Sequence, residues 1–211
     1  MIESTDSGKT WRTRSFAGEA DFHSLDYAHG TIYRYDSTNA LLRVSKDGAT
    51  WVARASLQAL DIAVSPDDPD TGFATTADGV AKSTDGGRTF APGKQPMMAF
   101  LSWVTPEALY GIDDSGTLSR CTDGGSTWAK AGSVPGGQAQ ALTAVDDQHI
   151  LAATQSGVYE SRDGGKTSSG SRSRQETATD HHAALNGTRR KAKVASVPPA
   201  GRPRAAAAHV R

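Results

Sequence analysis

Cysteine and net charge are both scarce in this chain, and each shortage excludes a class of protein. Cys121 is the single cysteine among 211 residues, which excludes an internal disulfide framework and fits no zinc-ligand pattern. Lys and Arg together number 23, as do Asp and Glu, so bulk charge gives no argument for nucleic-acid or membrane binding. No apolar run approaches the roughly 18 residues of a transmembrane helix. The polar start, Met1–Ser4, lacks the apolar core of a signal peptide.

Motifs of common catalytic and cofactor sites are missing as well. The chain contains no H-E-x-x-H and no G-x-S-x-G. Lys9 and Lys166 stand in Gly-Lys-Thr triplets, but a phosphate-binding loop also needs an earlier Gly, and Glu3 and Glu160 occupy that position. We therefore predict no cofactor, no metal site and no specific nucleic-acid ligand.

What the chain does contain is one short phrase in five near-copies. The copies span residues 4–11, 45–51, 83–90, 121–128 and 161–168. Their last positions lie 40, 39, 38 and 40 residues apart. A period near forty indicates supersecondary units that stack or are arranged radially.

The residue types within the phrase predict a β-hairpin turn closed by its own side chains. Gly supplies the positive φ of a tight turn, and an Asp before it accepts hydrogen bonds from backbone N–H groups. We interpret these carboxylates as turn formers rather than catalytic groups: Asp6, Asp47, Asp85, Asp123 and Asp163. A large ring ends most copies and is suited to packing against a neighbouring unit. The ring residues are Trp11, Trp51, Phe90 and Trp128.

The phrase resembles the Asp box, or bacterial neuraminidase repeat, S-x-D-x-G-x-T-W. The resemblance implies a β-propeller in which each box is the turn between the third and fourth strands of a blade, away from any catalytic centre. Three copies depart from the pattern: the second is one residue short between Asp47 and Thr50, Cys121 replaces Ser in the fourth, and Ser168 replaces the aromatic residue in the fifth. Phe90 for Trp in the third copy is a milder change.

Short apolar strands separated by Gly, Asp and Pro turns fill the chain between the boxes. We predict full four-stranded blades over residues 20–57, 58–95 and 96–133, and three strands of another blade over 138–167. The first strand of each unit is the most apolar, which indicates an innermost strand buried on both faces. The predicted fold class is all-β: a partial Asp-box propeller of about four blades. Either further blades precede residue 1, which we favour, or the strand 10–14 completes the last blade and closes a four-bladed ring.

Residues 168–211 differ in character from the blades of residues 1–167. The segment has nine basic and two acidic residues, a formal charge of +7, and few large apolar side chains. Such a composition predicts a disordered basic tail. We hypothesise that the reading frame shifts at Thr167, because a GC-rich gene read out of frame encodes this mixture of Arg, Ala, Pro and Ser. The alternative is a genuine basic tail, and sequencing the transcript distinguishes the two.

One candidate binding site stands out at the predicted mouth of the propeller channel. Asp21 and His23 enter the first innermost strand, and Asp61 takes the like place in the next blade if it aligns with His23. Such a pair could bind a metal or a sugar. The structural interpretation, a hydrogen-bonded His at a strand end, is favoured because one His and one Asp are too few for a metal site.

The family resemblance also brings sialidase activity into consideration. Sialidases use a Tyr nucleophile with a nearby acid, and the resemblance implies an arginine triad whose first member lies in an F/Y-R-I-P motif. The chain offers only Tyr33-Arg34-Tyr35-Asp36, and Glu in the predicted blades is limited to Glu19, Glu107 and Glu160. No catalytic residue is assigned.

We therefore predict a binding or scaffold module with a carbohydrate or protein ligand, as part of a larger protein. The alternative is a sialidase-like glycoside hydrolase or its remnant. A third option is an assembly factor like the photosystem-associated Asp-box propellers. The chain is similar to exported bacterial Asp-box proteins often labelled exo-sialidase or glycosylhydrolase, which implies an extracytoplasmic location for the intact protein.

Overall fold

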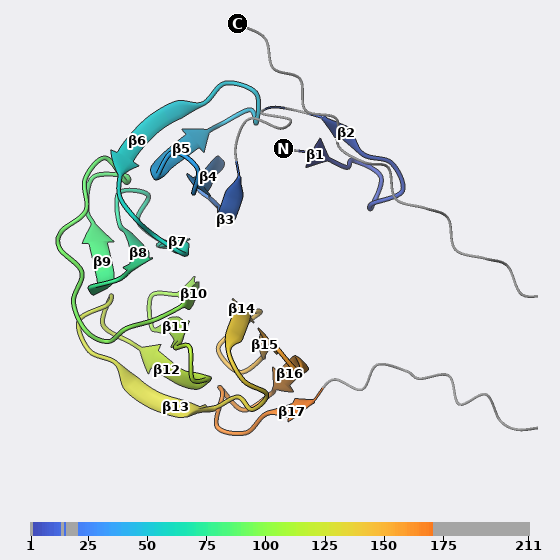
Figure 1. Cartoon of the computed structure of the whole chain (residues 1–211), viewed down its shortest axis with the longest axis vertical. Coiled ribbons are helices and arrows are strands. Elements are labelled where there is room, and N and C mark those ends of the chain that lie inside the picture. Colours follow the sequence, from blue (N-terminus) through green and yellow to red (C-terminus); the bar gives the residue numbers. More distant parts are fainter. Residues whose placement is uncertain (1, 14, 16–20, 171–211) are drawn as a thin grey trace, which may run out of the picture. The chain divides into compact units, whose positions relative to one another are not determined.

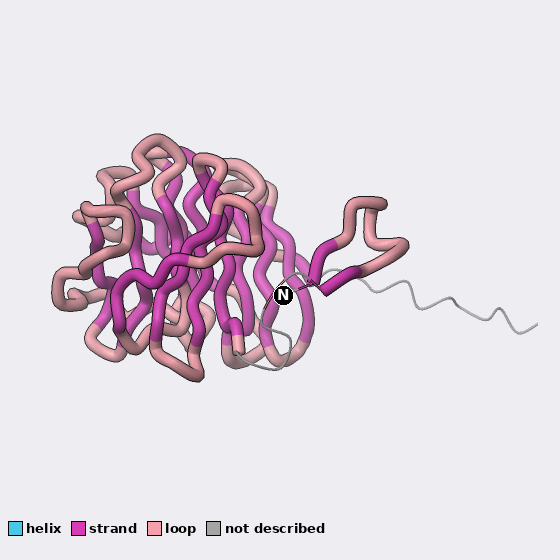
Figure 2. The backbone as a smooth tube through the Cα atoms, turned by 90° about the horizontal axis from the view of Figure 1, so that it is seen from above, coloured by secondary structure: helices cyan, strands magenta, loops and turns pink. Residues whose placement is uncertain are grey.

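The fold consists of short antiparallel strands, which the computed structural model describes over residues 2–13, 15 and 21–170. None of these residues is helical (Figure 2), in agreement with the all-β prediction, and so no helix within these ranges is long enough to cross a membrane. The strands are β1 (Ile2–Glu3), β2 (Arg12–Thr13), β3 (Phe22–Ala28), β4 (Thr31–Asp36), β5 (Leu41–Ser45), β6 (Val52–Ser56), β7 (Ile62–Val64), β8 (Gly72–Thr76), β9 (Gly79–Ser83), β10 (Phe100–Thr105), β11 (Ala108–Ile112), β12 (Thr117–Cys121), β13 (Ala129–Ser133), β14 (Ala139–Ala144), β15 (Ile150–Thr154), β16 (Gly157–Ser161) and β17 (Ser169–Gly170).

Four sheets and one hairpin are built from these strands. Each sheet is a meander, in the orders β3-β4-β5-β6, β7-β8-β9, β10-β11-β12-β13 and β14-β15-β16-β17, and β1 pairs with β2. The first strands of successive sheets are neighbours: β3 contacts β7, β7 contacts β10, and β10 contacts β14 (Figure 1). This is a four-bladed β-propeller arrangement, which confirms the predicted fold class. The predicted disordered tail lies, from residue 171 on, outside the described residues.

The strands run between two sets of turns, one at either end of the blades (Figure 2). In a meander, the turns after the first and third strands lie at one end, and the turn after the second strand lies at the other. We call the first end the turn face, and it carries the repeated phrase of the sequence. The opposite end, the connection face, also carries the links from one blade to the next.

Two blades differ from the predicted strand count. The second blade was predicted to have four strands but has three. Residues 90–95 are joined to β9 by an isolated bridge between Val80 and Lys94 and by a bond from the Ala91 N–H to the Lys82 carbonyl, without forming a strand. Pro92 lies in this segment and has no N–H to donate to a strand ladder. The last blade was predicted to have three strands and has four, because β17 pairs Ser169 with Glu160.

Burial is deepest in the second strands, not in the first strands as predicted. Every residue of the second strand β11 is buried. Among the first strands, β3 and β14 include several exposed positions, and only β7 is buried throughout. The first strand is the edge of its sheet and has a neighbour strand on one side only. The second strand has a strand on each side and a blade against each face, which removes it from water.

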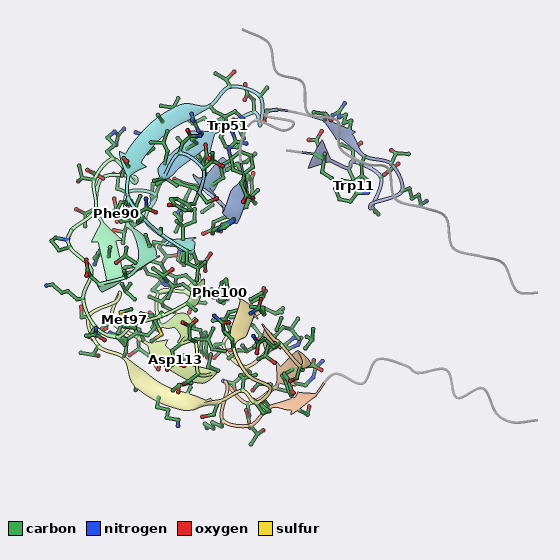
Figure 3. All side chains as sticks on the ribbon, viewed as in Figure 1. Trp11, Trp51, Phe90, Met97, Phe100 and Asp113 are labelled. Atoms are coloured by element: carbon green, nitrogen blue, oxygen red, sulfur yellow. The ribbon has the colours of Figure 1, made fainter. Side chains whose placement is uncertain are left out.

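The hydrophobic core is divided among the three joints between blades. Leu42, Val44 and Ile62 are central to the joint between the first and second blades, where Phe90 packs against them (Figure 3). Trp128 packs in the same way at the next joint. At the third joint, Ser168 takes the corresponding sequence position and is half-buried. The last joint therefore lacks the ring that the two preceding joints have.

Candidate functional site

The carboxylates of the repeated phrase close their own turns. Asp85 accepts hydrogen bonds from the Ser83 hydroxyl at 2.8 Å, from the backbone N–H of Thr89 at 2.9 Å and from the Thr89 hydroxyl at 2.7 Å. The Thr89 hydroxyl, then its N–H, lowers the pKa of Asp85 to about 2. These bonds occupy both carboxylate oxygens, so Asp85 acts within the turn.

The other four copies follow the same scheme. Hydrogen bonds lower the pKa of Asp6 and of Asp163 to about 2, with the hydroxyls of Thr10 and Thr167 as the largest causes. The backbone N–H of Thr50 is the largest cause at Asp47, whose pKa is also lowered. The thiol of Cys121, at 3.0 Å, replaces the hydroxyl donor and lowers the pKa of Asp123.

The second glycine of three turns touches the blade before it. Gly87 lies so close to Leu42 that a β-carbon on the glycine would be 2.5 Å from Leu42 Cδ2. A β-carbon on Gly125 would likewise overlap the Phe73 ring, and one on Gly165 would overlap Leu118. All three glycines have a positive φ, between 78° and 89°. Each turn therefore locks its blade onto the preceding one.

The predicted channel-mouth site is divided in the structure. His23 Nε2 lies 3.0 Å from Asp21 Oδ2, and both side chains are exposed. Asp61 instead accepts a hydrogen bond from the Ser24 hydroxyl at 2.5 Å and one from the Leu101 N–H at 2.8 Å. Asp61 therefore does not align with His23.

The strand register explains this difference from the predicted alignment. Counted back from the Ala28–Thr31 pair, Ser24 stands opposite Tyr35, and a β-bulge between Phe22 and Ser24 leaves His23 without a paired residue in β4. Ser24 therefore takes the place expected for His23. Burial raises the pKa of Asp61. His23 and Asp61 still line one cavity of about 420 Å³ beside the first strands, but no bond links them.

Polar side chains of the first strands tie neighbouring blades together, a feature that the sequence analysis missed. Asp26 accepts a hydrogen bond from the Val64 N–H at 2.7 Å, and Ser102 accepts one from the Ala144 N–H at 2.9 Å. With the bond from Leu101 to Asp61, each of the three joints has at least one such bond. The sequence signal that could have indicated these bonds is a Ser or Asp within an otherwise apolar first strand.

Arg34, the nearest candidate for a sialidase-type arginine, is enclosed in the first blade. Its guanidinium stacks over the ring of Phe22 at 3.8 Å and over the ring of Trp51 at 3.3 Å. The residue is fully buried, and burial lowers its pKa to about 10. Arg34 therefore supports packing and does not face a ligand. Trp11, by contrast, is 61% exposed, so it does not pack as the sequence predicted.

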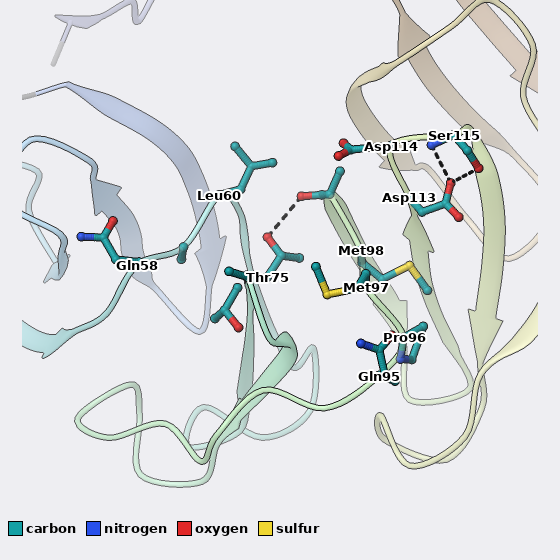
Figure 4. Close-up of a pocket in the computed structure, with 14 residues that line it drawn as sticks. Gln58, Leu60, Thr75, Gln95, Pro96, Met97, Met98, Asp113, Asp114 and Ser115 are labelled. Atoms are coloured by element: carbon teal, nitrogen blue, oxygen red, sulfur yellow. Dashed lines mark hydrogen bonds between the residues drawn. The ribbon is translucent and has the colours of Figure 1, made fainter.

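A cavity with exposed apolar walls lies on the connection face, between the second and third blades. It has a volume of about 720 Å³ (Figure 4). Thr75 donates a hydrogen bond to the Ala99 carbonyl at 3.2 Å and fixes the two blades to each other at the cavity wall. The lining residues are Gln58, Ala59, Leu60, Thr75, Thr76, Ala77, Gln95, Pro96, Met97, Met98, Ala99, Asp113, Asp114 and Ser115. We call it the connection-face pocket.

The pocket combines an apolar and an acidic side. Leu60 and Met97 are 42% and 45% exposed, and Asp113 and Asp114 follow β11 on the neighbouring blade. Burial pushes the pKa of Asp113 upward, but hydrogen bonds from Ser115 and Thr117 outweigh it, so the pKa is lowered. Asp113 is therefore ionised at neutral pH. Since no Lys, Arg or His lines the pocket, its acidic side favours a cationic or hydrogen-bond-donating ligand.

Metal binding has no basis in the part of the chain that the structure describes. No group of three or more His, Cys, Asp or Glu side chains within it is arranged to hold an ion.

Solved β-propellers share this fold. An ancestral GH74 enzyme superposes with a TM-score of 0.54 at 16% identity, over 71% of this chain and 24% of that chain. YCF48 bound to D1 peptide superposes with a TM-score of 0.53 at 15% identity, over 80% of this chain and 60% of that chain. A structure of the nidogen/laminin complex superposes with a TM-score of 0.58 at 12% identity, over 72% of this chain and 64% of that chain. This chain covers less than two thirds of each of these proteins.

Sequence comparisons give no closer assignment. No protein-family model matches the chain, and no curated protein matches it either. The chain is thus a β-propeller by its fold, and identities of 12–16% carry the likeness no further than that.

Proposed function

We propose that this chain is an Asp-box β-propeller that acts as a non-catalytic binding module, with a polypeptide segment as ligand in the connection-face pocket. One observation carries the proposal: a single cavity of about 720 Å³ pairs the exposed side chains of Leu60 and Met97 with the acidic residues Asp113 and Asp114. A concave site of mixed apolar and polar character is the usual form of a ligand site.

The lining chemistry favours a peptide over a carbohydrate. None of the lining residues is aromatic, so a sugar ring has no flat surface to stack on. Met97 is flexible and polarisable, which suits an apolar peptide side chain. Asp113 and Asp114 would attract a Lys, an Arg or an N-terminal amine. The fold neighbours YCF48 bound to D1 peptide and the nidogen/laminin complex support a binding role for such a scaffold.

The second candidate is a glycoside hydrolase or its remnant, and the fold likeness to GH74 enzymes favours it. Glycoside hydrolysis usually needs two available carboxyl groups. In the pocket, Oδ1 of Asp113 already accepts bonds from Ser115 and Thr117. The nearest match to the sialidase arginine motif, Arg34, is buried. Turnover of any substrate in a fluorogenic panel of glycosides and sialosides would overturn the binding proposal in favour of this one.

A random peptide library displayed on phage tests the binding proposal directly. We expect selected peptides to pair an apolar residue with Lys or Arg, and we expect Met97→Glu to abolish their binding. Asp114→Asn should weaken the binding of the basic peptides several-fold. The matched control is Val145→Glu, since Val145 is also exposed, at 53%, but lies outside the pocket. Failure to select any peptide, or selection of peptides indifferent to Met97→Glu, would contradict the proposal.

We also propose that the intact protein acts outside the cytoplasm. The support is the resemblance of the repeated phrase to exported Asp-box proteins. Fractionation of the native cells, with an antibody raised against this chain, tests the location. Recovery in the cytoplasmic fraction alone would contradict it.

A further inference from the structure

A second cavity lies on the turn face, at the joint between the first and second blades. Its volume is about 550 Å³, within the range of small-molecule sites. Its walls come from β4, β5 and β6 of the first blade and from the 69–70 and 86–88 segments of the second blade. The backbone N–H of Ala55 donates to the Gly87 carbonyl at 2.9 Å, and that of Gly86 donates to the Asp70 carbonyl at 2.9 Å. These bonds hold both walls in place.

Three permanently basic side chains line this turn-face cavity: Lys46, Arg54 and Arg88. Within the described ranges, none of them forms an ion pair with a carboxylate. Nε of Arg54 is buried and has no hydrogen-bond partner there. A buried N–H without an acceptor is costly, and an anionic oxygen would satisfy it.

A phenol adds a further donor to the same cavity. Tyr33 lines it, and no hydrogen bond of the Tyr33 hydroxyl is present in residues 2–13, 15 and 21–170. Burial is the largest cause of the raised pKa of Tyr33, so the hydroxyl keeps its proton at neutral pH. The Tyr33 hydroxyl and the Arg54 guanidinium both act as donors.

Two acidic residues also line the cavity, and they do not cancel its basic character. The Asp47 carboxylate accepts bonds from Ser45, Ala49 and Thr50 within its own turn. Asp70 is the remaining acid, against three basic side chains. The cavity is therefore net positive even with both acids ionised.

A basic side chain three residues after the ring position of the repeated phrase occurs at this joint alone among the three. Arg54 stands three residues after Trp51, and the residues three after Phe90 and Trp128 are Gly93 and Ala131. The scaffold does not require an arginine at this position, because the two other joints form without one.

We propose that the turn-face cavity binds a phosphate or sulfate group, with Arg54, Arg88, Lys46 and the Tyr33 hydroxyl as donors. A tetrahedral oxyanion offers several acceptor oxygens and matches a set of guanidinium, ammonium and phenol donors. This site lies at the opposite end of the blades from the connection-face pocket, so it does not depend on the proposed peptide ligand.

Isothermal titration calorimetry of the full chain with inorganic phosphate and, separately, inorganic sulfate tests the proposal at ionic strength held constant with chloride. We expect saturable binding of one ion per chain. Loss of a charged donor in Arg54→Gln should weaken affinity roughly tenfold or more. Equal affinity for both ions points to a site for any such dianion, and preference for phosphate or sulfate names the ligand; each result supports the proposal.

Arg162→Gln is the matched control, because Arg162 takes the same position in the fifth repeated turn as Lys46 takes in the second but lies outside the cavity. The affinity of the Arg162→Gln variant for phosphate or sulfate should stay within about twofold of that of the unmodified chain. If Arg54→Gln fails to fold, the exposed Lys46→Gln and Arg88→Gln variants provide the same test. Absence of saturable binding up to tens of millimolar, or equal losses in the control, would overturn the proposal.

Discussion

Gly125 lies against the ring of Phe73, one blade earlier in the chain, with no room between them for a β-carbon. The glycine also has φ of 89°, a conformation that side chains disfavour. Gly125 is thus needed for its backbone conformation and for its lack of a side chain. The contact joins the fourth repeated turn to the core of the second blade.

We expect Gly125→Ala to destabilise the protein by about 3 kcal/mol or more, because backbone strain and overpacking add. Gly124→Ala is the control: Gly124 has φ of 64°, but nothing lies within 4 Å of its would-be β-carbon. That variant should lose only about 1 kcal/mol, from strain alone. Urea unfolding of the three proteins measures the difference. Equal losses in both variants would show that the contact with Phe73 is unimportant.

An aromatic residue at position 168 should stabilise the last joint. Ser168 is half-buried, and its hydroxyl donates one hydrogen bond to the Ser133 carbonyl at 3.3 Å. A ring there would cover apolar atoms near Gly165 and Leu118, as Phe90 and Trp128 do at the earlier joints. Ser168→Trp should raise the free energy of unfolding by about 1 kcal/mol. Ser169→Trp, one residue further on and exposed, should change the free energy of unfolding by less than about 0.5 kcal/mol.

The carboxylates of the repeated turns should contribute stability that depends on pH. The pKa of Asp85 is about 2 in the folded chain, below the ordinary carboxyl value of 3.8, so the folded state favours the ionised form. That contribution is fully present above about pH 4 and is lost as the pH falls through about 2. The stability difference between the unmodified chain and Asp85→Asn should therefore be largest near pH 5 and shrink toward pH 2.

Asp78→Asn controls for the general effect of removing a surface carboxylate. Asp78 lies in a turn on the connection face, and its carboxylate accepts no hydrogen bond from the described residues. Chemical denaturation of each variant at pH 2, 3, 4 and 5 provides the comparison. A pH profile for Asp85→Asn that matches the Asp78→Asn profile would contradict the role assigned to the turn carboxylates.

Cys121 should be replaceable by Ser without loss. Its thiol donates to Asp123 at 3.0 Å and accepts the Gly125 N–H at 3.0 Å, as the serine hydroxyls do in the other turns. A hydroxyl is the stronger donor, so Cys121→Ser should equal or exceed the unmodified chain in thermal stability. Cys121→Ala removes both bonds at a buried site and should cost about 1–3 kcal/mol. A large loss in the serine variant would indicate that sulfur packing dominates.

The sequence predicted local chemistry better than alignment between blades. The Asp of each repeated phrase could be interpreted as a turn former because its partners lie within four residues. The missing fourth strand of the second blade was overlooked, although Pro92 was a visible warning. The alignment of His23 with Asp61 does not hold, because Ser24 rather than His23 stands opposite Tyr35 in the register of β3 and β4. The pocket walls at Met97 and Asp113 come from loops, whose mutual approach depends on the whole blade stack.

The glycine contacts give the chain a direction. Gly87, Gly125 and Gly165 each lie against side chains of the unit before their own, whereas Gly132 of the third blade lies against the backbone of the next unit, at the Gly165 carbonyl. Each unit of about forty residues therefore contains the turn glycine that contacts the preceding unit and the side chains that the next unit's turn glycine contacts. Duplication or loss of one such unit would change a single interface between blades, which makes the array easy to lengthen or shorten by recombination.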